Sequence, residues 1–327
     1  MKRLFLIIST ILTLTACSNE GASQKPHNRP ISFNNVSTRA DIDDIEDAGF
    51  GVWAGMKAND ETTYTPILEN EQVYLSGGEW TYDNTRYWLD NCDFSFIACY
   101  PRKDDYYTFN AENCSIEFSV AETPSETDFL VATNVTDTSF EGFNPANPVS
   151  LTFSHALTQV ALQIWRDGAK HANDEMRIKK VTLSNLAKAG TYSSATGVWS
   201  TTNEKLNLSY EKTEFTDADN IGAAIVMDNG TLDTGGKAAN PWGDMLLIPQ
   251  TLENVALRIT YELKRQNAVD WEEAELEAAL PPITWTMSNR YTYNVVLSSV
   301  TDITIYYIQT KVDPWGTPQV GGTVIIK

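Results

Sequence analysis

The residue types that could support chemistry are few in this 327-residue chain and are scattered along it. Nucleophilic catalysis needs a histidine beside a serine or cysteine and an orienting acid, yet His27, His155 and His171 lie far apart. His155, in "TFSHALTQV", follows an apolar stretch and is typical of a structural histidine; the alternative role is a general base. No GxSxG, HExxH, GxGxxG or P-loop motif occurs. We therefore predict no catalytic residue and no cofactor.

The acidic segment "DIDDIED", Asp41 to Asp47, resembles a calcium loop at first sight. An EF-hand loop needs an oxygen ligand at its fifth position and glycine at its sixth, where this chain has Ile45 and Glu46. We interpret the segment as a solvated acidic loop and predict no metal site. The chain holds 43 Asp and Glu residues, so carboxylate pairs with glycosidase spacing carry no signal.

The charge balance excludes one class of partner. The formal net charge is −19 and the sequence pI is about 4.5. A surface this acidic is repelled by a phosphate backbone and by anionic membrane surfaces, so we predict no nucleic-acid partner.

The first residues predict the cellular address. Lys2 and Arg3 precede an apolar run, Leu4 to Leu14, that is too short to span a bilayer as a mature helix. The sequence "LTAC" then resembles a bacterial lipobox, in which Cys17 receives lipid and residues 1–16 are removed; the alternative is an ordinary signal peptide. Residues 17–30 would form a polar tether to the outer membrane at the cell surface.

The remaining cysteines are Cys92, Cys99 and Cys114. Cys92 and Cys99 cannot form a disulfide within one extended strand, because seven residues span about 23 Å. A bridge between Cys99 and Cys114 across neighbouring strands stays open. No Cys/His spacing is typical of zinc.

Period-two alternation of apolar residues dominates the chain and predicts strands. In "NVALRITYELK", apolar residues from Val255 to Leu263 alternate with Ala256, Arg258, Thr260 and Glu262. "WEEAELEAAL" has helical propensity, but its β-rich context favours a strand. Further strands are predicted at "DFSFIACY", "CSIEFSV", "VSLTF", "TQVALQIW", "KKVTLSN", "YTYNVVL" and "DITIYYIQTKV".

The steps before Pro145 and Pro148 oppose a helix and mark a domain boundary. We predict one β-sandwich domain at residues 31–147 and a second at 148–327. "WTYDNTRYW" from Trp80 and "WTMSNRYTY" from Trp285 are weakly similar, which is compatible with duplicated domains.

An ordered series of short motifs along nearly all of the mature chain resembles the fimbrillin family of Bacteroidales, the FimA-like and Mfa-like subunits of type V pili. These motifs are "LTAC", "ISFNNVSTRA", "FGVWA", "DFSFIACYP", "DFLVATN", "VSLTFSHALTQVALQI", "LLIPQTLENVALRITYEL", "WTMSNRYTYNVVL" and "KVDPWG". The resemblance implies an all-β fold of two transthyretin-like β-sandwich domains in tandem.

The resemblance also implies a route of assembly. An Arg-specific protease would cut between Arg39 and Ala40 and release the first strand, to which Ile31 and Phe33 belong. The C-terminal strand of a neighbouring subunit, here Gln319–Lys327, would fill the groove that this strand leaves.

The tail has the pattern that such a groove accepts. Val320, Val324 and Ile326 fall on one face of an extended segment, and a strand this apolar is an aggregation hazard unless another strand pairs with it. Two alternatives stay open: Arg39 is an uncut loop residue, or the tail pairs within its own subunit. The position in the pilus, as stalk, tip or anchor, also stays open.

We therefore expect a non-enzymatic pilus subunit whose partners are other subunits, outer-membrane lipid through Cys17, and a host or bacterial surface ligand. The alternative function is a surface glycan-binding lipoprotein whose exposed tryptophans stack on sugars. An exported hydrolase is a third alternative.

Overall fold

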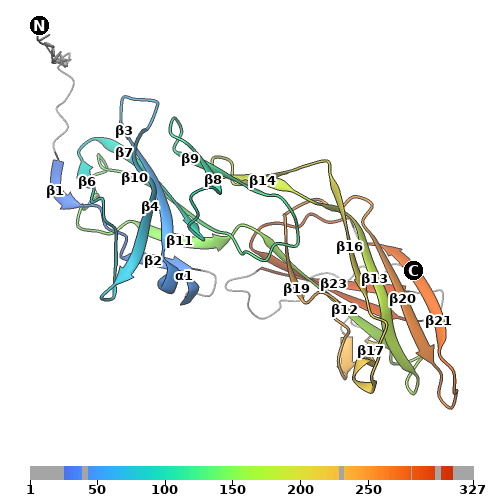
Figure 1. Cartoon of the computed structure of the whole chain (residues 1–327). Coiled ribbons are helices and arrows are strands. Elements are labelled where there is room, and N and C mark those ends of the chain that lie inside the picture. Colours follow the sequence, from blue (N-terminus) through green and yellow to red (C-terminus); the bar gives the residue numbers. More distant parts are fainter. Residues whose placement is uncertain (1–25, 39–42, 228–231, 281, 299–302, 312–327) are drawn as a thin grey trace, which may run out of the picture.

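The structure is a computed structural model that describes residues 26–38, 43–227, 232–280, 282–298 and 303–311 (Figure 1). Within these ranges the regular elements are strands, apart from the six-residue helix α1 (Asp43–Ala48) and a 3-10 turn at Asp217–Asp219. The prediction of an all-β fold is confirmed.

The largest sheet has seven strands and lies at one end of the molecule (Figure 1). In spatial order they are β2 (Asn35–Thr38), β11 (Ser150–His155), β10 (Leu130–Asp137), β7 (Cys92–Tyr100), β3 (Phe50–Ala58), β4 (Thr65–Ser76) and β5 (Glu79–Thr81). Strand β7 is buried along almost its whole length, because both faces of this sheet are covered.

Two different layers cover those faces. On one face lies a core that includes Phe50, Phe94, Phe96 and Phe153 and is closed by residues outside the sheet, Trp88 among them. On the other face, Trp53 and Ile97 pack against a four-stranded sheet. Its strands are β15 (Val198–Thr201), β14 (Gly190–Ser193), β9 (Ser115–Val120) and β8 (Tyr107–Asn110).

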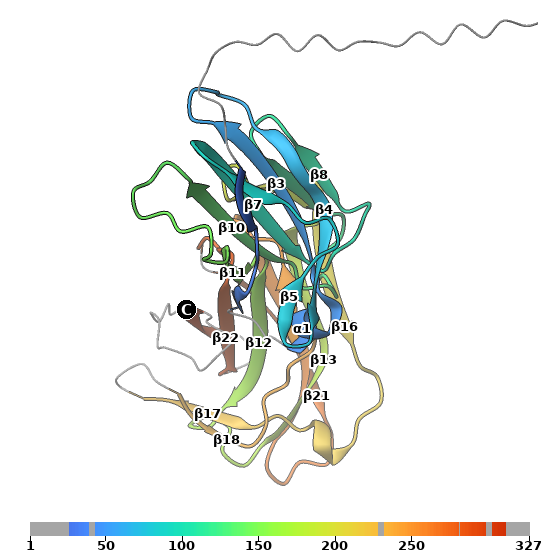
Figure 2. The same ribbon diagram turned by 90° about the vertical axis from the view of Figure 1, so that its left-hand side faces the viewer.

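The other end of the molecule is a sandwich of two sheets. The first contains β18 (Leu232–Gly235), β17 (Ala223–Val226), β12 (Thr158–Asp167), β22 (Asn289–Leu297) and β23 (Ile303–Lys311), with β19 (Asp244–Leu247) also paired to β12. The second contains β16 (Lys205–Glu211), β13 (Glu175–Ala187), β20 (Ala256–Lys264) and β21 (Glu272–Ala279). Figure 2 shows β22 beside β12, and β17 and β18 at the far end.

The core between these two sheets follows the predicted alternation. Leu257, Ile259, Tyr261 and Leu263 of β20 are all at most 1% exposed, while the residues between them face outwards or lie part-buried. Their partners come from β12, β13 and β22. The preference for a strand at "WEEAELEAAL" is also confirmed, since β21 pairs with β20 along its whole length.

Strands from both sides of residues 147/148 share two of the sheets. Strand β11 follows this point in sequence and pairs with β10, and β14 pairs with β9. The division of the chain into domains at 31–147 and 148–327 stays a prediction.

The interpretation of Asp41–Asp47 as a solvated loop is wrong from Asp43 onwards, where the chain is helical, although Glu46 and Asp47 are exposed. Helix α1 begins at Asp43, and Ile45 is fully buried in the core with Phe50. Gly49 ends the helix with a φ of 71°, and its N–H donates to the Ile45 carbonyl at 2.8 Å, which is the usual role of a glycine after a helix. Burial of the Ile45 side chain therefore packs this otherwise acidic helix against the core.

Cys92, Cys99 and Cys114, the cysteines within the described residues, are free and buried. The Cys114 thiol donates to the Ser95 carbonyl at 3.3 Å, so Cys114 lies beside Ser95. Cys99 is four residues after Ser95 in β7, and four residues of an extended strand span about 13 Å. This separation is beyond disulfide reach. Full burial raises the pKa of the Cys99 thiol well above its ordinary value.

Candidate functional site

Residues 26–38, the segment that was expected to leave on assembly, pack against the core that includes Phe50, Phe96 and Phe153. Strand β1 (Pro26–Pro30) pairs with β6 (Tyr87–Leu89), and β2 pairs in parallel with β11 at the edge of the seven-stranded sheet. Between β1 and β2, Ile31 and Phe33 are 1% and 0% exposed. These two residues were expected in the first strand; they lie outside any regular strand but within the core.

Backbone hydrogen bonds hold the segment on both sides. The Ile31 N–H donates to the Arg86 carbonyl at 2.8 Å, and the Val149 N–H donates to the Ser32 carbonyl at 2.7 Å. The Trp80 N–H donates to the Asn34 side-chain carbonyl at 3.0 Å. The segment is therefore hydrogen-bonded on two sides, to residues 80–88 on one side and to the start of β11 on the other.

The Phe33 side chain packs into this core. Its ring makes edge contacts with Tyr82 at a centroid distance of 5.4 Å and with Phe96 at 5.9 Å. Burial of a phenylalanine contributes about 1.5–3 kcal/mol to stability, and aromatic contacts add to it. Removal of this ring would leave an apolar pocket in the core.

Tyr82 joins the segment to residues 80–88 through one hydroxyl. The hydroxyl donates to the Ile31 carbonyl at 2.9 Å and accepts from the Arg86 N–H at 3.1 Å. Burial raises the pKa of Tyr82, and the Arg86 N–H opposes this rise only in part. The phenol therefore stays neutral and can act as donor and acceptor at once.

Tyr82 and Arg86 were not identified as site residues from the sequence. They belong to "WTYDNTRYW", which was noted only as a weak repeat. Its alternation of aromatic residues was the available signal, because Tyr82 and Trp88 both point into the core that receives Phe33.

At its edge the segment is held by a short ladder. The four residues of β2 pair with Ser150 to Phe153, and Val36 packs against the core. The Ser37 and Thr152 hydroxyls are 3.1 Å apart. If this segment left, the outer edge of β11 would expose unpaired backbone groups beside an apolar pocket, which is the surface that strand addition requires.

Several predicted site residues lie outside the described residues: Cys17, Arg39, Ala40, Val320, Val324 and Ile326. Thr38, the last residue of β2, directly precedes Arg39. At the other end, β23 forms the edge of its sheet, pairs antiparallel with β22 over nine residues and ends at Lys311. The structure therefore tests neither the cleavage nor the donated strand.

The described residues give little material for the alternative functions. They contain no group of three or more metal-ligating side chains and no helix that could cross a bilayer. His155 is fully buried with its Nδ1 2.6 Å from Asp128. Each of the eight tryptophans in the described ranges is buried or part-buried, so none is an exposed platform for a sugar.

Comparisons with known proteins agree with this fold. The sequence profile of a family described as fimbrillin-like matches residues 38–315. A fimbrial protein from Bacteroides vulgatus superimposes with a TM-score of 0.63 at 17% identity, over 87% of this chain and 99% of that one. A fimbrial assembly protein from Parabacteroides distasonis gives a TM-score of 0.40 at 10% identity, over 91% and 100% of the two chains. No curated protein matches the sequence.

Proposed function

The chain belongs to the fimbrillin-like family, and we propose on this basis that it is a structural subunit of a type V pilus. It is exported as a lipoprotein through Cys17 and is held on the outer membrane until it is processed. Cleavage between Arg39 and Ala40 releases the first segment, and the strand Gln319–Lys327 of a neighbouring subunit takes its place. The resulting fibre at the cell surface supports adhesion to a host or bacterial ligand.

One observation supports this mechanism above the others. The segment that precedes Arg39 is packed against the rest of the chain: β1 and β2 pair with other strands, and Ile31 and Phe33 are at most 1% exposed. Its backbone bonds go to residues far along the chain, namely Arg86, Val149 and the strand β11. A segment bound in this way can be replaced by another strand that offers the same backbone groups and alternate apolar side chains.

The tail offers such side chains. Val320, Val324 and Ile326 share one face in an extended conformation, and each fully buried aliphatic side chain contributes about 1.5–3 kcal/mol. Gly321 and Gly322 allow the chain to bend as it passes from one subunit to the next.

The test is assembly triggered by proteolysis. Full-length protein treated with an Arg-specific protease should form a ladder of oligomers that resists mild detergent. Arg39→Ala should abolish the ladder, whereas the matched control Arg29→Ala, in the same segment, should leave it intact. Equal ladders from both variants would show that cleavage at residue 39 is not the trigger.

The role of the tail needs a separate variant. Deletion of Gln319–Lys327 should allow cleavage at Arg39 but prevent the ladder. Polymerisation of this truncated chain would overturn strand donation by the tail.

The glycan-binding lipoprotein remains an alternative proposal without a specific observation in its favour, since the described tryptophans are at least part-buried. A polysaccharide-dependent mobility shift that is lost on substitution of Trp199 or Trp242 would revive it.

A further inference from the structure

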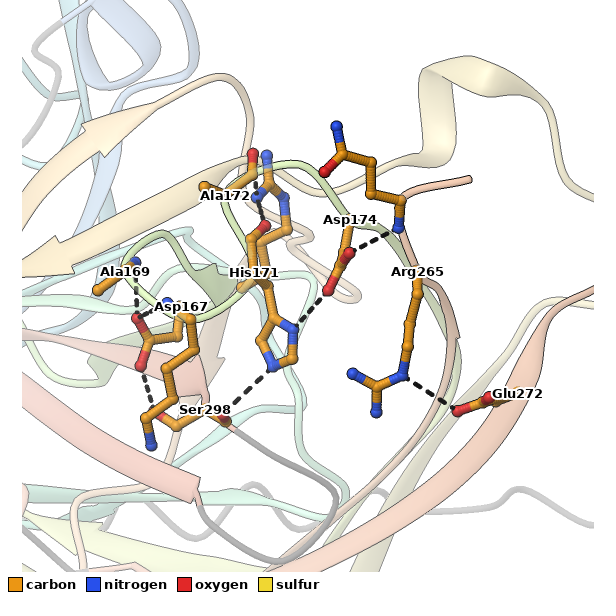
Figure 3. A network of polar contacts seen from close by, with 11 residues as sticks. Asp167, Ala169, His171, Ala172, Asp174, Arg265, Glu272 and Ser298 are labelled. Carbon is orange, nitrogen blue, oxygen red and sulfur yellow. Dashed lines mark hydrogen bonds and ion pairs between the residues drawn. The ribbon is translucent and has the colours of Figure 1, made fainter. Parts of the chain in front are cut away.

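The turn between β12 and β13 encloses a histidine that the proposed function does not use. His171 is 7% exposed and lies in the loop Asp167–Asp174 (Figure 3). Its Nδ1 is 2.9 Å from an Asp174 carboxylate oxygen, and its Nε2 is 3.2 Å from the backbone carbonyl of Ser298. The ring thus bridges this loop and the residue that follows β22.

Both partners of the ring are acceptors. The Ser298 carbonyl cannot donate, and the hydrogen bond from His171 lowers the pKa of Asp174, so that this side chain is a carboxylate. A neutral imidazole has one N–H and one lone pair, and in this position the lone pair would face an acceptor oxygen. Only the imidazolium form satisfies both contacts.

The arrangement is not a catalytic triad, although it combines Asp, His and Ser. The Nε2 of His171 faces the Ser298 carbonyl, while the Ser298 hydroxyl donates to Asp167 at 2.8 Å. The serine oxygen is therefore held away from the base that would have to activate it.

The loop holds the histidine in place through its own backbone. Asp167 accepts from the N–H groups of Ala169 and Lys170, and its carbonyl accepts from the His171 N–H at 2.8 Å. Arg166 donates to the carbonyls of His171 and Ala172. These bonds fix the backbone around the ring independently of its contact with Ser298.

Charged groups from the neighbouring elements surround the pair without replacing it. Arg265, which directly follows β20, further lowers the pKa of Asp174 and pairs with Glu272 at 3.6 Å. The Gln266 N–H donates to Asp174 at 2.8 Å. Glu175, at the start of β13, is engaged by Lys264 and Asn220. The charged groups around the ring's two partners are thus Asp167, which accepts from the Ser298 hydroxyl, and Arg265, which acts on Asp174 through its charge.

The contact with Ser298 lies where β22 ends and the connection to β23 begins. Ser298 follows the last residue of β22, and β22 pairs with β23 from Leu297↔Ile303 onwards. The contact therefore lies at the closed end of the β22–β23 hairpin, and β23 forms the sheet edge from which the C-terminal residues continue.

We propose that His171 is a pH-sensitive clasp that fixes the closed end of the β22–β23 hairpin in its imidazolium form and releases it on deprotonation. A neutral ring keeps its Nδ1–H on Asp174, so the Nε2 lone pair faces the Ser298 carbonyl and that bond is lost. The sign follows: the closed clasp binds one more proton than the open one, so it strengthens as the pH falls. At still lower pH it weakens, where Asp174 itself is protonated.

The first test observes the ring directly. Full-length protein with ¹⁵N-labelled histidine should show two protonated nitrogens for His171 at about pH 5 and one at about pH 8, the range in which histidines change charge. His171→Gln assigns the signal. A neutral tautomer at about pH 5 would overturn the proposal.

The second test observes the hairpin. After correction for intrinsic exchange, amide hydrogen exchange at residues 295–298 should be about tenfold faster at about pH 8 than at about pH 5, as expected for the loss of one charge-assisted hydrogen bond. Asp174→Asn should reduce this ratio to about twofold or less, because an amide can donate to a neutral ring and keep both contacts. The matched control Asp270→Asn, on the exposed loop after β20, should keep the ratio of the parent protein. Equal ratios in all three proteins would overturn the clasp.

A consequence for assembly rests on the proposed function: release of the hairpin end should make cleaved subunits assemble faster at about pH 8 than at about pH 5, and Asp174→Asn should remove most of this difference. The exchange measurement decides the clasp by itself. If exchange behaves as expected and cleaved protein forms no ladder at either pH, then strand exchange fails and the clasp stands. If ladders form but exchange is independent of pH, the clasp fails alone.

Discussion

Two sheet edges in this molecule are protected in opposite ways. Strand β21 is an edge strand whose outward residues Glu273, Glu275 and Glu277 face solvent. Strand β2, at the edge of the seven-stranded sheet, reads Asn-Val-Ser-Thr and carries no charge. Charged side chains along an edge discourage another strand from pairing there, whereas a short uncharged edge offers no such barrier.

The two edges also differ in what holds them. On β21, Glu277 accepts from Arg258 at 2.5 Å and Glu273 pairs with Lys179, so charges on β20 and β13 neutralise the row in part. On β2 there are only four ladder pairs, and the side chains of Ile31 and Phe33 just before it are buried in the core. The difference teaches that charge protects the first edge, whereas the second edge, which the proposed strand exchange would open, carries no charge of its own.

The largest effect is expected from Phe33→Ala. Loss of a fully buried ring between Tyr82 and Phe96 should lower the free energy of unfolding by about 3–5 kcal/mol. Urea unfolding measures this loss, and hydrogen exchange at β11 locates it, because the edge of β11 should exchange faster when residues 26–38 loosen.

The matched control is Leu276→Ala on β21. This residue is 6% exposed in the other core, so it should cost about 2–5 kcal/mol without faster exchange at β11. If both variants, or neither, accelerate β11, the segment of residues 26–38 is not the feature that distinguishes the two edges.

The strands of both regions were predictable from the sequence, but the partners of the edges were not. Alternation marks β20 and β9 because each strand has one buried face. Nothing local shows that β9 pairs with β14, 70 residues later in the chain, because register between distant strands depends on the packed core. Helix α1 escaped prediction since it is six residues long and owes its position to Ile45.

The site was predictable to a similar degree. The family resemblance assigned Ile31 and Phe33 to the first strand; both are buried in the core, although they lie outside any regular strand. The roles of Tyr82 and Arg86 depend on a phenol hydroxyl that meets two backbone groups from residues far apart in sequence. Periodicity reports which face a residue occupies and contains no information on such a contact.

Tyr82→Phe should have a smaller effect than loss of Phe33. The variant keeps the ring and removes the hydroxyl that joins Ile31 to Arg86, which should cost about 1–2 kcal/mol in urea unfolding. The neighbouring Tyr87→Phe, at a side chain that is 52% exposed, should cost much less.

The pH dependence sharpens this prediction. Because burial raises the pKa of Tyr82 in the folded protein, its stabilising contribution is complete below the ordinary tyrosine pKa of about 10 and is lost as the pH rises above it. The difference in unfolding midpoint between the parent and Tyr82→Phe should therefore be smaller above about pH 10 than at about pH 8. If the difference in midpoint is the same at both pH values, the stabilising contribution of the hydroxyl does not depend on its protonation.

The smallest effect on stability, with the most direct bearing on the closed edge, is expected from neutralising β21. The triple variant Glu273→Gln, Glu275→Gln and Glu277→Gln removes the exposed charges but keeps side-chain length, so the unfolding midpoint should barely change. Sedimentation velocity should nevertheless show more self-association, because an edge strand without charge accepts another strand. The control variant Glu112→Gln, Glu122→Gln and Glu126→Gln changes the net charge equally at exposed positions outside β21. If both triple variants self-associate equally, net charge governs association, and the glutamates of β21 have no special part in keeping that edge closed.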